Sequence, residues 1–277
     1  MKWSNILVAV LWWAGGLNLW AQKIAAGDIT DLYASTKQIA QFFKRFNNEE
    51  DRQGVAYDPK SPLYREPEQR KEYLHLLFDQ QALTIPQSLR KEFIVEVTQK
   101  EAPIFLDFFG GEWFAEVRVA VSYNGKEEEA ILFMNLEKDR QGYKWVIDRA
   151  YFRPYAAYIK PLTKNPNNFL HPQSHELGFM NLNRAFETAS TIEDYTSKNY
   201  ESLTHLQLFL YELRRGMIRF ITVNETRFHF FQVKGWYFEV ANFNRSGLNS
   251  GWLISNLVRL PPEQKNVMLS YVYRENR

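Results

Sequence analysis

The chain has 277 residues, of which 45% are hydrophobic and 24% charged, and this composition is typical of a folded globular protein rather than a disordered chain. The 34 basic and 32 acidic side chains nearly cancel to a net charge of +2, so the sequence predicts no nucleic-acid partner and no bulk attraction to anionic lipid. Cysteine is absent, which excludes disulfides, thiolate metal ligands and a thiol nucleophile.

Residues 1–21 have the pattern of a secretory signal peptide. Lys2 precedes an apolar run from Ile6 to Trp20, and the small residue Ala21 follows it. As a helix this run would span only about 22 Å, whereas the hydrocarbon core of a bilayer is roughly 30 Å thick. We therefore expect export, removal of the signal, a periplasmic or extracellular location, and no stable membrane span in the mature chain.

Residues 28–153 are predicted to form a first α+β domain. Apolar positions at helical spacing indicate helices at 28–50, 72–80 and 87–98, although 93–97 also fits a strand. Alternation of apolar and polar residues indicates strands at 113–123, 129–136 and 142–152. Asn124 and Gly125 separate the first two strands and predict a tight hairpin, because both tolerate a positive φ.

Residues 154–173 are rich in proline and asparagine, and we expect a linker there. The segment 174–277 is predicted to be a second α+β domain. Helices are expected at 174–190 and 203–215, and strands at 217–223, 227–233, 236–243 and 252–260, with 267–273 either a short edge strand or a trailing end. The predicted fold class is therefore α+β, with two tandem helix-then-antiparallel-meander domains, each a curved sheet covered by helices.

The last strand of the first half has the pattern Gly-x-x-Trp-x-Ile at residues 142–147, and Gly251, Trp252 and Ile254 echo it. Together with a long aromatic first helix and further helices, this resembles the nuclear transport factor 2-like superfamily of cone-shaped α+β folds. The resemblance covers residues 30–152 and, more loosely, 174–260. It implies a helix-covered sheet whose concave face can form an apolar pocket. That superfamily includes enzymes, ligand binders and interaction modules, so the resemblance does not select a function.

Two titratable sites are candidates for proton transfer. Asp148 and Arg149 lie on opposite faces of their strand, so only one of them would face the pocket. On one choice of face Asp148 is a pocket acid, and on the other Arg149 is a pocket cation. The favoured alternative is that they form a cross-strand ion pair or are surface charges. His229 lies among aromatic residues. It would serve either as a general base near neutral pH or as a hydrogen-bonded core histidine, and the structural interpretation is favoured.

Two further groups of residues have both a functional and a structural interpretation. His171 and His175 have the spacing of a zinc-ligand pair, but Pro172 lies between them and no third ligand is evident, so surface histidines are favoured. Trp145, Tyr151 and Trp236 would stack on a ligand if they were exposed, together with Arg149 as a binding cation. Otherwise these aromatic residues fill the core.

The sequence contains no glycine-rich phosphate loop after a strand and no Gly-x-Ser-x-Gly elbow. Our leading hypothesis is therefore an exported, non-enzymatic protein of the bacterial envelope, without a cofactor, that binds an envelope protein or a small apolar ligand. The alternatives are a cone-fold enzyme that uses a pocket acid or histidine, and a structural spacer.

Overall fold

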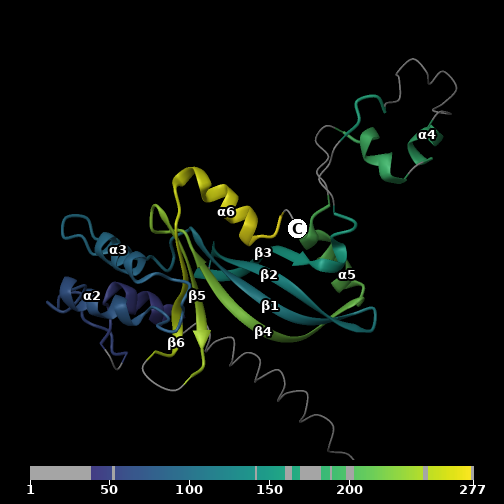
Figure 1. The fold of residues 1–277 in the computed structure, drawn as a ribbon. Helices are drawn as coiled ribbons and strands as arrows, with labels where there is room; N and C mark the ends of the chain where they lie inside the picture. Colours follow the sequence, from purple (N-terminus) through teal and green to yellow (C-terminus); the bar gives the residue numbers. More distant parts are fainter. Residues whose placement is uncertain are drawn as a thin grey trace, which may run out of the picture.

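The protein combines helices with one six-stranded antiparallel sheet, as a computed structural model shows (Figure 1). The α+β class is therefore confirmed. The structure describes residues 39–51, 54–140, 142–159, 164–168, 182–187, 189–197, 203–245 and 249–275. The expected signal at 1–21, residues 160–163 and 169–173 of the expected linker, and about half of the expected helix at 174–190 lie outside these residues.

The six strands are long, and each pairs only with antiparallel neighbours. They are β1 (Trp113–Tyr123), β2 (Lys126–Asp139), β3 (Gly142–Phe152), β4 (Ile218–Phe230), β5 (Trp236–Phe243) and β6 (Gly251–Arg259), in the order β3-β2-β1-β4-β5-β6. The two halves of the chain therefore meet where β1 pairs with β4, from Trp113 opposite Phe230 to Tyr123 opposite Ile218.

The expectation of a separate sheet in each half is wrong at this point. A three-stranded meander leaves one edge of β1 with unpaired backbone donors and acceptors. Strand β4 satisfies that edge along its whole length, so both halves contribute to a single sheet.

Strand β4 also corrects a second expectation, because the two strands predicted at 217–223 and 227–233 form one continuous strand, with no turn at Asn224 and Glu225. Glu225 lies opposite Arg118 and Val223 lies opposite Val119, so Asn224 has no counterpart on β1. A second shift leaves Ile221 without a counterpart in the same way. These positions are β-bulges, which accommodate one extra residue and let the strand continue.

The helices differ from the prediction mainly in their bounds. Residues 39–47 are helical, followed by α2 (Pro67–Leu76), α3 (Gln87–Val97), α4 (Asn183–Phe186), α5 (His205–Arg214) and α6 (Lys265–Val272). Helix α2 begins before the expected residue 72 because Pro67 stands at its first position and the side chain of Glu66 caps the amides of Glu68 and Gln69. In α3 the helical alternative is confirmed, since the buried residues Phe93, Ile94 and Val97 share one helical face.

The segment 267–273 was expected to be an edge strand or a trailing end, and this is also wrong. It forms most of helix α6, which lies over the sheet (Figure 1). Val272 lies one helical turn after Met268 and Leu269, and the three side chains belong to one apolar cluster with Phe114 and Phe133 of the sheet.

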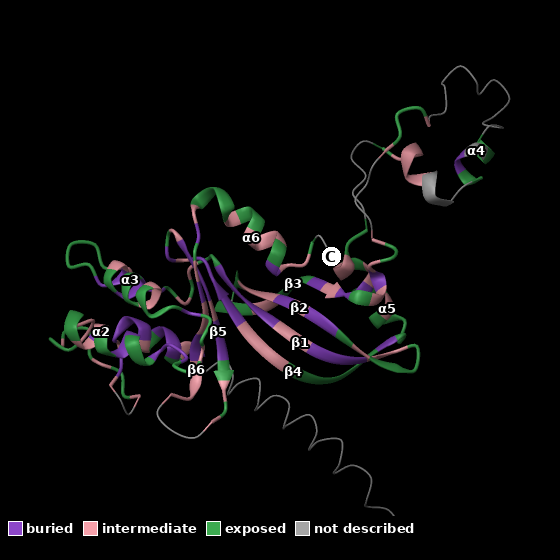
Figure 2. Ribbon diagram, in the orientation of Figure 1, coloured by how far each residue is buried: buried purple, intermediate pink, exposed green. Residues whose placement is uncertain are grey.

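The core has three parts, two on one face of the sheet and one on the other (Figure 2). Helix 39–47, α2 and α3 cover one end of the first face, where Phe46, Phe93 and Phe238 are buried. Phe209 of α5 packs on Val119 and Phe152 at the other end of that face. Helix α6 covers the opposite face.

The predicted hairpin at Asn124 and Gly125 is confirmed. Their φ angles are 50° and 75°, as a tight turn between β1 and β2 requires. Gly125→Ala is expected to lower the free energy of unfolding by about 1 kcal/mol, because an L side chain is strained in the left-handed region. A matched control is Gly111→Ala, since Gly111 has no left-handed φ and open space around it. Urea unfolding of both variants tests this, and an equal effect would contradict it.

Candidate functional site

Most of the residues singled out from the sequence lie in structural or solvent-exposed positions. Asp148 and Arg149 of β3 are both exposed and form an ion pair at 3.4 Å. Arg149 also bonds Glu275 and lies over the ring of Tyr273 at 4.4 Å. They line an open groove of about 460 Å³ between β3, α5 and the residues after α6, and neither is a buried pocket group.

The aromatic candidates pack against other protein rings. Trp236 is 1% exposed within the core, and Trp145 lies edge-on to Trp113 at 5.5 Å between ring centroids. Tyr151 stacks on the ring of His205 at 5.1 Å. His171 and His175 lie outside the described residues, and within those residues no cluster of metal-binding side chains occurs.

His229 stands at the centre of a buried polar cluster beneath α6. Its ring is only 2% exposed. Nδ1 lies 2.9 Å from the hydroxyl of Tyr237 on β5, and Nε2 lies 3.2 Å from a carboxylate oxygen of Glu116 on β1. The β1–β4 register places Phe114 opposite His229. Glu116 is two residues further along β1, so its side chain lies on the same face and reaches the ring.

Glu116 is buried but remains ionised. Burial by itself would raise the pKa of its carboxyl, but the hydrogen bond from His229 and the positive charges of Arg118 and Arg274 outweigh this and lower the pKa to about 2. Burial and the nearby carboxylates raise the pKa of Tyr237, so its hydroxyl keeps its proton. The cluster therefore holds one carboxylate and one neutral phenol around the imidazole.

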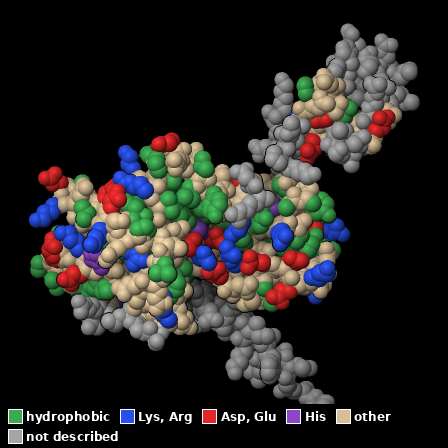
Figure 3. All heavy atoms as spheres, in the orientation of Figure 1, with side chains coloured by type: hydrophobic (Ala, Val, Ile, Leu, Met, Phe, Trp, Pro, Cys, Tyr) green, Lys and Arg blue, Asp and Glu red, His purple; other side chains and the backbone are tan. Residues whose placement is uncertain are grey.

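A network of charged side chains continues this cluster across the face of the sheet on which α6 lies (Figure 3). Arg118 contacts Glu116 at 3.0 Å and also reaches Glu129 and Glu225 at 3.5 Å. Arg227 pairs with Glu225 at 2.8 Å and with a further carboxylate on β5 at 3.2 Å. Both arginines and Glu116 line a groove of about 360 Å³ together with α6, and each of these two arginines has a carboxylate partner.

This geometry gives His229 no atom with which to act on a substrate. The Glu116 carboxylate accepts a hydrogen bond from Nε2–H, so Nδ1 either accepts from the Tyr237 hydroxyl or donates to it. Both ring nitrogens are engaged in either protonation state, and almost none of the ring is exposed. The favoured interpretation of His229 as a hydrogen-bonded core residue therefore agrees with these contacts.

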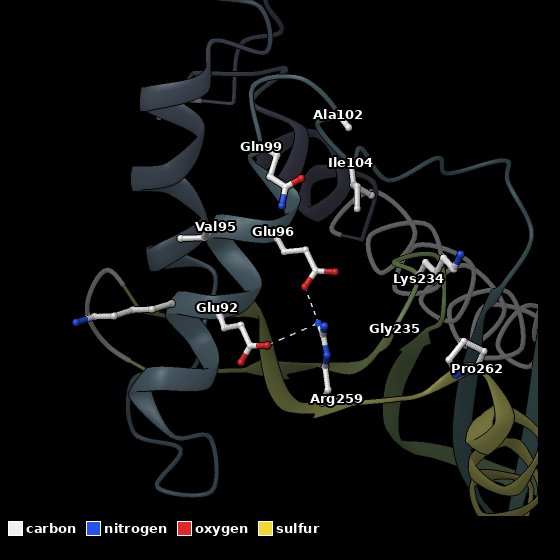
Figure 4. A pocket seen from close by; sticks show the side chains of 11 residues that line it. Glu92, Val95, Glu96, Gln99, Ala102, Ile104, Lys234, Gly235, Arg259 and Pro262 are labelled. Atoms are coloured by element: carbon white, nitrogen blue, oxygen red, sulfur yellow. Dashed lines mark hydrogen bonds and ion pairs between the residues drawn. The ribbon is translucent and has the colours of Figure 1, made fainter.

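A wider groove of about 780 Å³ lies between α3 and the end of β6 (Figure 4). Arg259 of β6 stands at its centre between two acids of α3, with contacts of 2.5 Å to Glu96 and 3.8 Å to Glu92. Its guanidinium also lies over the ring of Trp236 at 4.6 Å. The charged centre of this groove is thus already neutralised, and it ties β6 to α3.

The most accessible feature is the outer edge of β4. Strand β5 pairs with β4 only from Arg227 to Phe230, so residues 218–226 have no strand on their outer side within the described chain. In Figure 1 this part of β4 forms a margin of the sheet, and Figure 2 shows it largely exposed. Phe220, Ile221 and Val223 are 51%, 47% and 44% exposed.

Exposed apolar side chains also precede β4 in the chain. They include Leu210, Leu213 and Met217, and α5, which carries the first two, contacts β4. We call residues 218–226, together with these three side chains, the β4 edge surface. An unpaired strand edge flanked by exposed apolar side chains is the kind of surface to which another strand adds.

No protein-family model, curated protein or solved structure matches this chain. The resemblance to the nuclear transport factor 2-like superfamily therefore stays a prediction. Among the described residues, every helix is too short or too polar to cross a bilayer. Function must accordingly be argued from the surfaces and side chains themselves.

Sequence reasoning did not single out Glu116 or the β4 edge surface, and it did not connect Tyr237 with His229. Alternation along 113–123 does place Glu116 on the face opposite the large apolar residues of β1, which is a usable signal. The edge surface also has a signal, because Phe220, Ile221 and Val223 form an apolar run. Its exposure depends on long-range pairing, because β5 pairs with β4 only from Arg227 to Phe230.

Proposed function

We propose that this chain is an exported, non-enzymatic interaction protein of the bacterial envelope, and that it binds an extended polypeptide segment at the β4 edge surface. The observation that carries this proposal is the unpaired outer edge at residues 218–226, with Phe220, Ile221 and Val223 exposed beside it. Added strands gain main-chain hydrogen bonds from such an edge and specificity from the side chains that flank it.

The other sites support the non-enzymatic part of the proposal. His229 has both nitrogens engaged, Arg259 is neutralised by two acids, and Asp148 is an exposed ion-pair partner. Each of these groups has a protein partner that accounts for it. The secretory pattern of residues 1–21 supports the location, because a chain that carries it would act outside the cytoplasm.

The order of elements supports a finer proposal, that the two halves arose as tandem copies of one helix-then-meander unit. Helices precede β1–β3 in the first half, and α4 and α5 precede β4–β6 in the second. In this proposal the two copies share one sheet through the pairing of β1 with β4. In the second copy, residues 218–226 of β4 remain unpaired on the edge away from β1.

The binding surface can be tested with random peptides displayed on phage and selected on the purified protein. We expect the selected peptides to be extended sequences with alternating apolar residues, and Ile221→Lys or Val223→Lys to abolish their binding by placing a charge on the surface. The matched control is Val95→Lys, because Val95 is 64% exposed on α3, away from β4. Peptide binding that survives both β4 variants would overturn the proposal, and so would failure to select such peptides on a chain whose β4 edge no other strand occupies.

A further inference from the structure

The β4 edge surface is self-complementary, and we propose that its partner is a second copy of this chain. The two β4 strands would pair antiparallel about a twofold axis at Thr222, so that the sheets of both copies become continuous. This inference rests on the proposed function, because it uses the same β4 edge surface. It adds the identity of the polypeptide that binds there.

Charge complementarity selects the centre of the pairing. When Thr222 lies opposite itself, Arg219 of one copy lies opposite Glu225 of the other, and the symmetry makes this pair twice. Both residues are on the same face of the sheet, because they pair with Ser122 and Arg118, which alternate together along β1. Residues directly opposite in antiparallel strands share a face, so the two charges can meet.

Other registers lose this match. Moving the centre to Val223 would place Arg219 opposite Arg227 twice, and like charges directly opposite are destabilising. Moving the pairing by a single residue would exchange the faces of the side chains. Arg219 is exposed and has no ion-pair partner among the described residues, so its charge is available for a second copy.

The apolar residues and the bulges fit the same pairing. About Thr222, Ile221 of each copy lies opposite Val223 of the other, which covers apolar side chains that are now exposed. Bulges twist an edge and thereby hinder pairing with a flat strand. A second copy carries the same bulges at symmetry-related positions, so its twist matches, and the closed twofold contact limits assembly to a dimer.

The absence of cysteine from the chain makes a direct test straightforward. In Thr222→Cys the only two thiols of a dimer would face each other across the axis, at a separation that antiparallel pairs and disulfides have in common. We expect mild oxidation to convert this variant rapidly to a covalent dimer. Val95→Cys, which puts an exposed thiol on α3, should remain mostly monomeric. Equal rates for the two variants would overturn the proposed centre.

Charge exchange provides the second test, with sedimentation velocity over a range of protein concentrations as the readout. The unaltered chain should dimerise as its concentration rises. Arg219→Glu and Glu225→Arg should each be monomeric, because each places two like-charge pairs in the interface, and the double variant should dimerise again. Glu225 also pairs with Arg118 and Arg227 within its own copy, so circular dichroism must confirm that its variants fold, and Ile221→Lys provides a disrupting change away from those pairs.

The outcomes separate this inference from the proposed function. A chain that stays monomeric at every concentration, or a folded double variant that does not recover the dimer, overturns the second copy as partner. If selected peptides still bind at β4 in that case, the edge serves a different polypeptide and the proposed function stands. If neither peptides nor a second copy bind there, both proposals fail.

Discussion

Arg70→Met is expected to lower the free energy of unfolding by about 4 kcal/mol, since each lost hydrogen bond to a charged group costs roughly 1.5–3 kcal/mol. Arg70 of α2 is 1% exposed. Its guanidinium donates to the carbonyl oxygens of Phe46 and Val97, each at 2.9 Å, and to that of Ile104. Methionine matches the length of the side chain but removes a donor from all three carbonyl groups, of which that of Val97 keeps a second donor, the backbone N–H of Ile104 at 3.0 Å.

Among the described residues, Arg70 donates its hydrogen bonds to carbonyl oxygens and forms no ion pair with a carboxylate. Burial, and to a lesser extent the nearby charge of Arg65, lowers the pKa of Arg70 to about 10, so the side chain is still charged at neutral pH. The ring of Phe105 also lies 4.4 Å from the guanidinium. One side chain thus joins the helix at 39–47, the end of α3 and the segment that leads to β1.

Two control variants separate this role from a general effect of charge. Arg70→Lys keeps the charge, but its single ammonium group cannot follow the planar fork that reaches three carbonyls, so it should recover only part of the loss. Lys71→Met, next to it on α2, removes an exposed pair with Glu68 and should cost less than about 1 kcal/mol. Urea unfolding measures all three variants, and comparable losses for Arg70→Met and Lys71→Met would contradict the assignment.

Local patterns were sufficient for several elements of the fold. Strands β3 and β5 begin and end where alternation and glycine-containing turns placed them, at 142–152 and 236–243. The Asn124–Gly125 turn followed from the φ values that these two residues tolerate. These features depend only on residues close together in the chain, and a sequence displays such residues directly.

Long-range pairing could not be read in the same way. Trp113 and Phe230 are neighbours across β1 and β4, but alternation shows only which face a residue occupies and not which strand lies beside it. The single sheet was therefore missed, and the contact of Glu116 with His229 was missed with it. Arg70 had a local signal, since it shares the buried helical face of Tyr73 and Leu74, although its three carbonyl partners come from distant segments.

Glu116→Gln is expected to lower the free energy of unfolding by about 3 kcal/mol near neutral pH, because the shift of the carboxyl pKa from 4.5 to about 2 corresponds to that energy at roughly 1.4 kcal/mol per pKa unit. Glutamine keeps the shape of the side chain but cannot carry the charge. His229 and Arg274 would then lose the carboxylate that they contact at 3.2 and 3.4 Å.

The pH dependence of this loss has a definite sign. The folded-state pKa of Glu116 lies below its unfolded value, so the carboxylate stabilises the fold above about pH 4.5, and this contribution disappears as the pH falls towards 2. The difference in stability between the unaltered chain and Glu116→Gln should therefore be largest near neutral pH and should shrink over that acidic range. Urea unfolding at a series of pH values measures the difference.

Glu129→Gln is the matched control for this prediction. Glu129 contacts the same Arg118 at 3.5 Å but is 47% exposed, and exposed ion pairs contribute only about 0–1 kcal/mol. Its substitution should leave the stability and its pH dependence nearly unchanged. A loss in Glu116→Gln that is the same at every pH would show that the residue acts by packing alone. A difference in stability that shrinks as the pH falls towards 2 would instead establish that the charge of one buried carboxylate holds β1, β4 and the residues after α6 together.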